Sequence, residues 1–392
     1  MTDNAPIVVQ KYGGSSVADV DRIRAVAERV AKTREAGNRV VVVVSAMGDT
    51  TDELLALARS VCESPSRREL DMLLTAGERI AMALLSMALN ARGVPAVSFT
   101  GSQSGIITDE AHTNARIVEV RPHRVLEELG RGKVVIVAGY QGVSRTREVT
   151  TLGRGGSDAT AVALAAALEA KACEIYSDVD GVYTADPRVV ETSYRLDEIS
   201  YDEMQAMAES GARVLAAQAI EQARAGNVIV HARQSFGSTA ETRIVPSSPN
   251  GRRVVGVAAQ KGLFALRAKG DALELADELG RRGLPAQDLV LDGEGGFSLL
   301  VSKERVLDWE GPLRALAERG IAVEEGLGTI SLVGTGLDED AAVLRGFLET
   351  LGAVRPGRLT TSRFRISAWI PEGEADRLAV ELHRRFLEEG RG

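Results

Sequence analysis

Residues 1–245 alternate short, almost wholly apolar runs with longer segments of helical pattern. The apolar runs are rich in Val and Ile and lack in–out alternation, which is typical of strands covered on both faces of a sheet. Strands are expected at Ile7–Lys11, Val40–Ser45, Ala96–Thr100, Val134–Ala138, Glu174–Ser177 and Val228–Ala232. Helices are expected between and after them, at Asp19–Glu35, Thr51–Ser60, Ala76–Arg92, Ala159–Ala170 and Tyr201–Ala225. This alternation predicts an α/β fold, a three-layer α/β/α sandwich with a mainly parallel sheet.

The pattern changes after residue 245. Residues 246–253 (PSSPNGRR) combine prolines, serines and a glycine without periodicity, which predicts a linker. An internal repeat follows, because Phe297 and Phe364 each begin a short run that leads into an acidic-basic helix. The spacing between Phe297 and Phe364 also separates Phe264 from Ser331, and a helix is again expected after each of these two residues. Two copies of a β-α-β-β-α unit explain the repeat, and such paired units commonly bind effectors or form dimer contacts. We expect the copies at residues 254–327 and 328–392.

Composition and charge narrow the class of protein. The chain has 392 residues, of which 44% are hydrophobic and 26% charged, as in an ordinary globular protein of two or three domains. The formal net charge is −8, whereas a protein that binds nucleic acid normally has a strongly basic surface. The longest nearly uncharged strip, Arg39–Met47, is far short of the ~20 apolar residues that cross a membrane. The first ten residues do not resemble a signal peptide, and Cys62 and Cys173 fit neither a CxxC motif nor a disulfide framework. We therefore expect a cytoplasmic enzyme or sensor without nucleic-acid or membrane partners.

A glycine pair follows the first predicted strand. Lys11-Tyr-Gly-Gly-Ser-Ser16 contains Gly13, Gly14 and Ser15 and runs directly into a helix. Glycines allow the backbone to approach a bulky anion, and amides at a helix start supply donors. Lys11 lies where its ammonium could reach phosphate oxygens. A plain tight turn would explain the two glycines equally well.

The second predicted strand ends in Ser45-Ala-Met-Gly-Asp-Thr-Thr-Asp52. Ligands of open α/β sheets bind beyond the carboxyl ends of the strands, so this loop faces the same crevice as the glycine pair. Its hydroxyl groups and Gly48 suit a small polar substrate. Capping of the next helix by Thr50 or Thr51 is an alternative.

Thr151-Leu-Gly-Arg-Gly-Gly-Ser-Asp158 is the most specific local pattern. Three glycines surround Arg154, and Ser157 and Asp158 precede an Ala-rich helix. Asp158 could be the N-cap of that helix, but an N-cap does not require glycines around an arginine. That arrangement is typical of a guanidinium bound to a carboxylate or phosphate. Asp158 could then hold the Lys11 ammonium, or a metal near a transferred phosphate.

A turn-rich, acidic stretch, Ser177-Asp-Val-Asp-Gly-Val-Tyr-Thr-Ala-Asp-Pro-Arg188, follows a later strand. Its Asp-X-Asp-Gly pattern lacks the remaining ligands of a calcium loop. A loop that holds a nucleotide through its backbone, Tyr183 and Arg188 fits better. The four histidines have no metal-ligand spacing, so no protein metal site is predicted.

Together these stretches resemble the aspartate kinases of the amino-acid kinase family, the bacterial type with a kinase domain followed by two ferredoxin-like (βαββαβ) ACT domains. The motifs that carry the resemblance occur in the family's order: KYGGSS (11–16), VVVVSAMGDTTDELL (41–55), LLTAGERIA (73–81), SFTGSQSGIITD (98–109), TTLGRGGSDATA (150–161) and YSDVDGVYTADPR (176–188). The resemblance implies ATP-dependent phosphorylation of the side-chain carboxylate of L-aspartate to 4-phospho-L-aspartate. That reaction is the first step toward lysine, threonine, methionine and diaminopimelate. The resemblance also implies Mg²⁺ carried by the nucleotide and a homodimer formed through the ACT-like units.

The resemblance assigns a role to individual residues. The ATP phosphates would be held by Lys11, Gly13, Gly14 and Ser15. The nucleoside side would be held by Ser177, Asp178, Tyr183, Asp186 and Arg188. Aspartate would be held by Ser45, Thr50, Glu78, Arg154 and Ser157. Arg154 would bind a carboxylate, Glu78 would lie near the amino group, and Asp158 would organise the catalytic Lys11. No general base is needed, because the attacking carboxylate is already ionised at neutral pH.

Three departures from the family qualify this interpretation. Arg213 stands where relatives often have a catalytic Lys, and it keeps the positive charge in a forked form. The turns before two predicted ACT helices, 268–272 and 337–341, lack the family's Pro-Gly, and 291–294 lacks its Gln-Asn pair. We therefore expect weakened feedback by lysine and threonine. Residues 228–236 also differ, which we interpret as variation in packing.

Two alternatives stay open. A sister kinase acting on another carboxylate, such as N-acetylglutamate, is disfavoured because Glu78 suits a free amine. A catalytically weak paralogue that acts as a sensor or partner subunit would be explained by Arg213 and the altered ACT turns. The presence of Lys11, Arg154 and Asp158 favours an active kinase.

Overall fold

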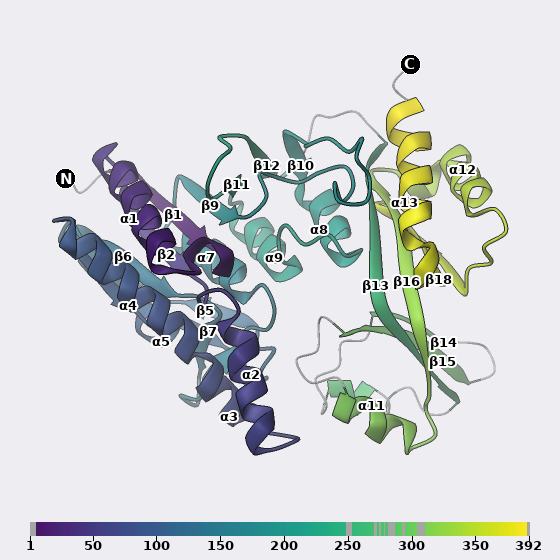
Figure 1. The fold of residues 1–392 in the computed structure, drawn as a ribbon, viewed down its shortest axis with the longest axis horizontal. Helices are drawn as coiled ribbons and strands as arrows, with labels where there is room; N and C mark the ends of the chain where they lie inside the picture. Colours follow the sequence, from purple (N-terminus) through teal and green to yellow (C-terminus); the bar gives the residue numbers. More distant parts are fainter. Residues whose placement is uncertain are drawn as a thin grey trace. The chain divides into compact units, whose positions relative to one another are not determined.

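The computed structural model describes residues 5–247, 253–269, 287–291, 295–303 and 310–389, together with residues 273, 276, 277, 279 and 280. The chain forms two compact units that do not follow it linearly (Figure 1). Unit 1 comprises Met1–Val182, Leu196–Tyr201 and Val214–Ser248. Unit 2 comprises Tyr183–Arg195, Asp202–Arg213 and Pro249–Gly392.

An eight-stranded sheet forms the centre of unit 1, in the order β10-β12-β11-β9-β1-β2-β6-β3. All neighbouring pairs are parallel except β11 and β12. The strands are β1 (Ile7–Tyr12), β2 (Arg39–Val44), β3 (Ala96–Phe99), β6 (Val134–Ala138), β9 (Ala172–Ser177), β10 (Glu198–Ser200), β11 (Val230–Gln234) and β12 (Glu241–Val245). The predicted α/β fold with a mainly parallel sheet is confirmed.

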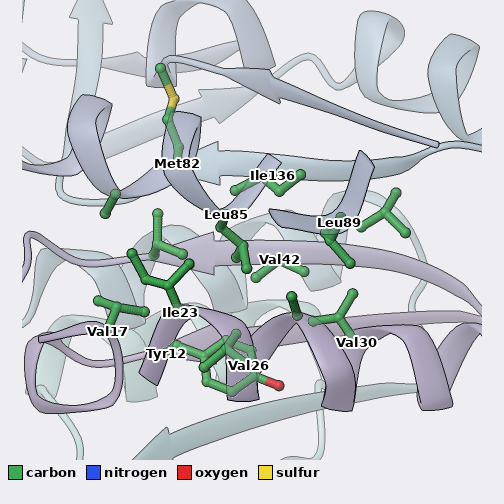
Figure 2. Packing of buried hydrophobic residues seen from close by; sticks show 14 of the residues in the cluster. Tyr12, Val17, Ile23, Val26, Val30, Val42, Met82, Leu85, Leu89 and Ile136 are labelled. Atoms are coloured by element: carbon green, nitrogen blue, oxygen red, sulfur yellow. The ribbon is translucent and has the colours of Figure 1, made fainter. Parts of the chain in front are cut away.

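Helices cover both faces of this sheet. On one face, α1 (Val20–Glu35) and α4 (Ala76–Ala91) pack Val26 and Leu85 against Val42 of β2, in the cluster that Figure 2 shows. Val41 and Val43 point to the other face, where they are equally buried and where α7 (Gly156–Ala167) contacts β1 and β2. Burial on both faces explains why β2 is a continuous valine run rather than an alternating one. The remaining helices of unit 1 are α2 (Thr50–Val61), α3 (Arg67–Leu74), α5 (Gly101–Ser104), α6 (His123–Gly130) and α9 (Ala217–Gly226).

A second, four-stranded sheet in unit 1 has the order β5-β4-β7-β8. It consists of β4 (Ile106–Thr108), β5 (Ile117–Val120), β7 (Gln141–Ser144) and β8 (Val149–Thr151). Helix α3 contacts β8. Residues Arg67–Ala91 are the one segment of the described chain whose length and apolar composition would allow a membrane span. They form α3 and α4, and α4 buries Leu85 and Leu89 in the core of unit 1.

Two predicted helix boundaries are wrong. The single helix expected over Tyr201–Ala225 is divided into α8 (Tyr201–Glu209) and α9. Gly211, with a φ of +109°, lies between them, and this left-handed region ends a helix. Helix α7 begins at Gly156 rather than Ala159, because Gly155, at a φ of +75°, takes the N-cap position.

Unit 2 contains a six-stranded antiparallel sheet in the order β14-β15-β13-β16-β18-β17. The strands are β13 (Val254–Lys269), β14 (Gln287–Leu291), β15 (Gly296–Ser302), β16 (Ala322–Gly334), β17 (Arg358–Thr361) and β18 (Arg365–Pro371). The long central strands β13 and β16 pair with each other, and each half repeats the same order outward (Figure 1). Phe264 and Ser331, which the repeat aligned, lie on these two central strands. Among the described residues, the α-helices of this unit are α8 (Tyr201–Glu209) from Asp202 on, α11 (Glu310–Ala317), α12 (Ala341–Leu351) and α13 (Ala375–His383).

Some sequence-based assignments fall outside the described residues. Residues 248–252 of the predicted linker are among them, as are most of the turns at 268–272 and 291–294. The boundaries placed at 245, 253 and 327 stay predictions. Unit 2 also contains Tyr183–Arg195, whose Ala185 and Val190 pack into the same apolar cluster as Ile330 and Leu378.

Candidate active site

Lys11 and Asp158 form an ion pair at the carboxyl end of the parallel sheet. Lys11 is the penultimate residue of β1 and is only 9% exposed, and its Nζ lies 2.6 Å from Oδ1 of Asp158. Asp158 lies in the first turn of α7, after the N-cap Gly155, so the N-cap alternative for Asp158 is wrong. A buried ammonium is thereby fixed where ligands of parallel α/β sheets bind.

The glycine pair after β1 packs closely against the loop after β2. A Cβ added to Gly14 would lie 3.0 Å from the carbonyl oxygens of Ala46 and Gly48, and the Gly48 amide donates to the Gly14 carbonyl at 3.1 Å. A Cβ on Gly13 would lie 3.5 Å from Nζ of Lys11. The exposed Ser15 follows in a short 3-10 turn, Gly14–Val17. The glycines therefore bring the two loops together beside Lys11.

Glu78 is a buried carboxylate beside the β2 loop. It lies in the first turn of α4, is 3% exposed, and its Oε1 accepts a hydrogen bond from the Ala46 amide at 3.1 Å. Its Oε2 is buried and has no hydrogen-bond partner among the described residues. Loss of solvation raises the pKa of Glu78 to about 7, although the Ala46 hydrogen bond opposes the shift. A buried, unpartnered carboxylate oxygen is a natural acceptor for a ligand ammonium.

Ser45 and Thr50 lie on the same loop, with Ser45 directly after β2 and Thr50 as the first residue of α2. Asp49 takes the N-cap position of α2, so neither Thr50 nor Thr51 is the N-cap, and the Thr50 hydroxyl donates to the Met47 carbonyl at 2.6 Å. A Cβ on Gly77 would lie 2.7 Å from that of Ala46. The start of α4 therefore approaches this loop closely.

Arg154 lies on the glycine loop between β8 and α7. Its side chain is 58% exposed, and Nη2 lies 3.9 Å from Oδ1 of Asp52. Gly153 and Gly155 on either side have φ values of +73° and +75°, which explains the glycines of this motif. Ser157 is buried, and a Cβ on Gly139 at the end of β6 would lie 2.7 Å from its Oγ.

Sequence reasoning missed two buried polar residues near this loop. Tyr140 has a φ of +67°, uncommon outside glycine, and burial raises the pKa of its hydroxyl, with Thr151 and Glu78 among its neighbours. Asp71 is fully buried on α3 and accepts hydrogen bonds from Thr151 and Thr113. No helix was expected over Arg67–Leu74; a helix there would have placed Asp71 on the same face as the apolar Leu70 and Leu74.

Ser177 and Asp178 line a pocket of about 540 Å³ in unit 1. The other lining residues are Ser15, Ser16, Asp19, Asp21, Arg22, Ala25, Gln234, Ser235 and Phe236. Gln234 Nε2 donates to the Asp178 carbonyl at 3.0 Å. The stretch 228–236 therefore does more than vary the packing, because its last three residues form a wall of this pocket.

Tyr183, Asp186, Arg188 and Arg213 belong to unit 2. Asp186 accepts hydrogen bonds from Nη2 of Arg188 at 2.7 Å and from Nε at 3.0 Å. These bonds, chiefly, hold the pKa of Asp186 below its usual range, and the charge of Arg213 lowers it further. Arg213 therefore lies in the electrostatic reach of the predicted nucleotide loop.

Comparison with known proteins agrees with this geometry. Residues 6–232 match the model of the amino acid kinase family. The chain is 46% identical to an aspartokinase of Corynebacterium efficiens, over 97% of this chain and 96% of that one. It is 44% identical to an aspartokinase of Mycobacterium tuberculosis, with the same coverage. The chain belongs to the aspartokinases.

Solved aspartokinase structures have the same fold. Escherichia coli aspartokinase III in complex with aspartate and ADP (R-state) superimposes with a TM-score of 0.83 at 26% identity, covering 97% of this chain and all of that one. The complex of the same enzyme with lysine and aspartate (T-state) gives a TM-score of 0.72 at the same identity and coverage.

Proposed function

We propose that this aspartokinase transfers the γ-phosphoryl group of ATP to the side-chain carboxylate of L-aspartate, giving 4-phospho-L-aspartate and ADP. The observation that carries the proposal is the Lys11–Asp158 ion pair beside the glycine pair of β1. Phosphoryl transfer from ATP depends on positioning and on stabilisation of charge. Membership of the aspartokinase family supports aspartate as the acceptor.

In this mechanism the aspartate carboxylate attacks the γ-phosphorus as an anion, so the protein supplies no general base. Lys11 stabilises the negative charge of the transferring group, and Asp158 fixes the ammonium of Lys11 for that task. Arg154 binds a carboxylate of the substrate and Glu78 binds its ammonium. Ser45, Thr50 and Ser157 complete the aspartate site.

The nucleotide is held by two sets of residues in this proposal. Gly13, Gly14 and Ser15 bind the phosphates with Lys11. The nucleoside side is bound by Ser177, Asp178, Tyr183, Asp186 and Arg188, and Arg213 supplies a further cation. Mg²⁺ carried by ATP would neutralise phosphate charge, and Asp158 beside the glycine pair would offer it a carboxylate oxygen.

The decisive experiment measures ADP release with Mg²⁺-ATP and L-aspartate and traps the acyl phosphate with hydroxylamine. Hydroxamate should form with the native protein, and Lys11→Ala should reduce its rate by at least about 100-fold, because charge stabilisation is lost. Lys32→Ala, which removes an exposed lysine of α1, is the matched control and should leave the rate unchanged. Hydroxamate from N-acetylglutamate alone would indicate a sister kinase. ATP binding without any hydroxamate would indicate a sensor or partner subunit.

The proposal also covers the oligomeric state of the protein and its regulation by amino acids. We expect a homodimer formed through the ACT-like units of residues 254–392, which light scattering of the purified chain would measure. We also expect weakened feedback by lysine and threonine.

A further inference from the structure

Both carboxylate oxygens of Asp71 have hydrogen-bond partners although the residue is fully buried. Oδ1 accepts from the Thr151 hydroxyl at 2.6 Å and from the Thr113 amide at 3.0 Å. Oδ2 lies 2.6 Å from Nδ1 of His112 and 3.2 Å from the Thr113 amide. A buried carboxylate is costly unless it is satisfied in this way, and a satisfied polar network fixes the geometry of the segments that it joins.

The partners of Asp71 support the loop that carries Arg154. Thr151 ends β8, and its carbonyl accepts from the Ala115 amide at 2.8 Å. A Cβ on Gly153 would lie 2.9 Å from Oδ1 of Asn114, so residues 112–115 pack directly against this loop. The Arg154 side chain itself is mostly exposed, with Asp52 3.9 Å away. Its position is therefore set mainly by the backbone that Asp71 holds.

Asp71 also belongs to the helical segment that leads to Glu78. The Asp71 carbonyl accepts from the Thr75 amide at 3.2 Å, at the junction of α3 and α4. The Thr75 carbonyl accepts from Nε2 of Gln141 at 3.1 Å, which ties the junction to β7. Glu78 follows within the first turn of α4. One residue thus contacts the Arg154 loop through its side chain and the Glu78 segment through its backbone.

We infer that Asp71 is a positioning residue for aspartate binding: through Thr151 it sets the spacing between Arg154, which binds a substrate carboxylate, and Glu78, which binds the substrate ammonium. This inference rests on the proposed function. It assigns Asp71 no contact with substrate. Its effect appears in the affinity for aspartate and not in that for ATP, because the network touches neither the glycine pair of β1 nor the pocket at Ser177.

Neighbouring threonines provide a matched pair of variants. Thr151→Val removes the hydroxyl that donates to Asp71, whereas Thr150→Val removes an equally buried hydroxyl that lies 2.6 Å from Oγ1 of Thr108. Thr151→Val and Asp71→Asn should each raise the KM for aspartate by about 10-fold or more, since displacement of a binding group by a fraction of an ångström is felt strongly. The KM for ATP should stay within about twofold of the native value. Thr150→Val should leave both KM values unchanged, and any effect should be confined to thermal stability.

The KM of a double variant distinguishes action through Thr151 from a general structural role of Asp71. If Asp71 acts through Thr151, Asp71→Asn combined with Thr151→Val should raise the KM for aspartate no further than Asp71→Asn alone. Equal effects of Thr150→Val and Thr151→Val on that KM would overturn the inference, as would parallel changes in both KM values. Should Asp71→Asn fail to fold, the comparison of the two threonine variants still decides. Absence of turnover in the native protein would instead refute the proposed function.

Discussion

In the proposed aspartate site, Glu78 combines burial with a task that needs its charge. Its carboxylate must be ionised to bind the ammonium of aspartate, yet loss of solvation raises its pKa to about 7. The kcat/KM for aspartate should therefore rise with pH and level off above about 7, because this ratio reports ionisation in the free enzyme. Initial rates at limiting aspartate and saturating Mg²⁺-ATP, measured from pH 5.5 to pH 8.5 (about three units around the transition), test this expectation.

Glu78→Gln is the control for that profile. The amide keeps the shape of the side chain and an oxygen that can accept from the Ala46 amide, but it does not ionise. We expect a higher KM for aspartate at every pH and no inflection near 7. An unchanged inflection in Glu78→Gln would assign the titration to another group and remove Glu78 from the ammonium site.

The same carboxyl makes a prediction for stability with a definite sign. Its pKa is higher in the folded protein than the ordinary value of 4.5, so the folded state binds the extra proton. The free energy of unfolding should therefore fall as pH rises from 4.5 to about 7, by up to about 3 kcal/mol, and then remain constant with respect to this group. Glu78→Gln should be more stable than the native chain above pH ~7 and lose that advantage toward pH ~4.5. Denaturant unfolding at both ends of this range is the measurement, and a variant less stable at the upper end would contradict the assignment.

At the scale of elements, a single glycine sets the distance between β6 and α7. A Cβ on Gly139 would lie 2.7 Å from both Cβ and Oγ of Ser157 and 3.0 Å from its Cα. Gly139→Ala should therefore displace the first turn of α7, lower the free energy of unfolding by about 1–3 kcal/mol and raise the KM for aspartate. Thermal unfolding and steady-state kinetics on the same preparation measure both effects.

Gly130 is the matched control for Gly139. It ends α6, nothing lies within 4 Å of an added Cβ, and its φ is not in the left-handed region. Gly130→Ala should leave the kinetics unchanged and raise stability by about 0.4–1 kcal/mol, because alanine restricts the unfolded chain. A Gly139→Ala variant that behaves like Gly130→Ala would show that α7 can shift without cost.

The sequence predicted well those elements whose burial is visible in the hydrophobic pattern of the segment itself. The valine run of β2 indicated a strand covered on both faces, which the structure confirms. The division at Gly211 was missed because the apolar periodicity continues across this residue, whereas the helical backbone conformation ends there. Asp71 was missed for a different reason. Its partner Thr151 lies far along the chain, and no periodicity reports which distant hydroxyl a buried carboxylate meets.

For the whole molecule, the linear division of the chain into catalytic and regulatory parts is less distinct than the sequence implied. Tyr183–Arg195, which carries three predicted nucleotide residues, belongs to unit 2. Thr184 within it is fully buried, and its hydroxyl lies 2.9 Å from Nε2 of His383 in the last helix. The Thr184 carbonyl also accepts from the Val257 amide of β13 at 2.7 Å. Part of the predicted nucleotide loop is therefore built on the same apolar core as the C-terminal sheet.

Feedback inhibition by an amino acid would depend on the amides at the start of α12. The family resemblance implies that amides before an ACT helix bind the effector amino acid, yet here the Asp340 carboxylate accepts from the amides of Ala342 at 2.9 Å and Val343 at 3.2 Å. Asp340 also pairs with Arg253. An effector carboxylate would have to displace a side chain that already satisfies these donors and opposes a second negative charge.

Lysine or threonine should consequently cause no inhibition at millimolar concentration or below. E. coli aspartokinase III, which has been crystallised with lysine, is the positive control in the same assay. Asp340→Gly frees the Ala342 and Val343 amides and removes the competing charge, so it should strengthen any residual binding of these amino acids, measured by calorimetry. If the native chain is inhibited at or below millimolar effector, the amides of α12 are not what limits feedback. If Asp340→Gly binds no more tightly than the native chain, the altered turn rather than its occupied amides accounts for the loss.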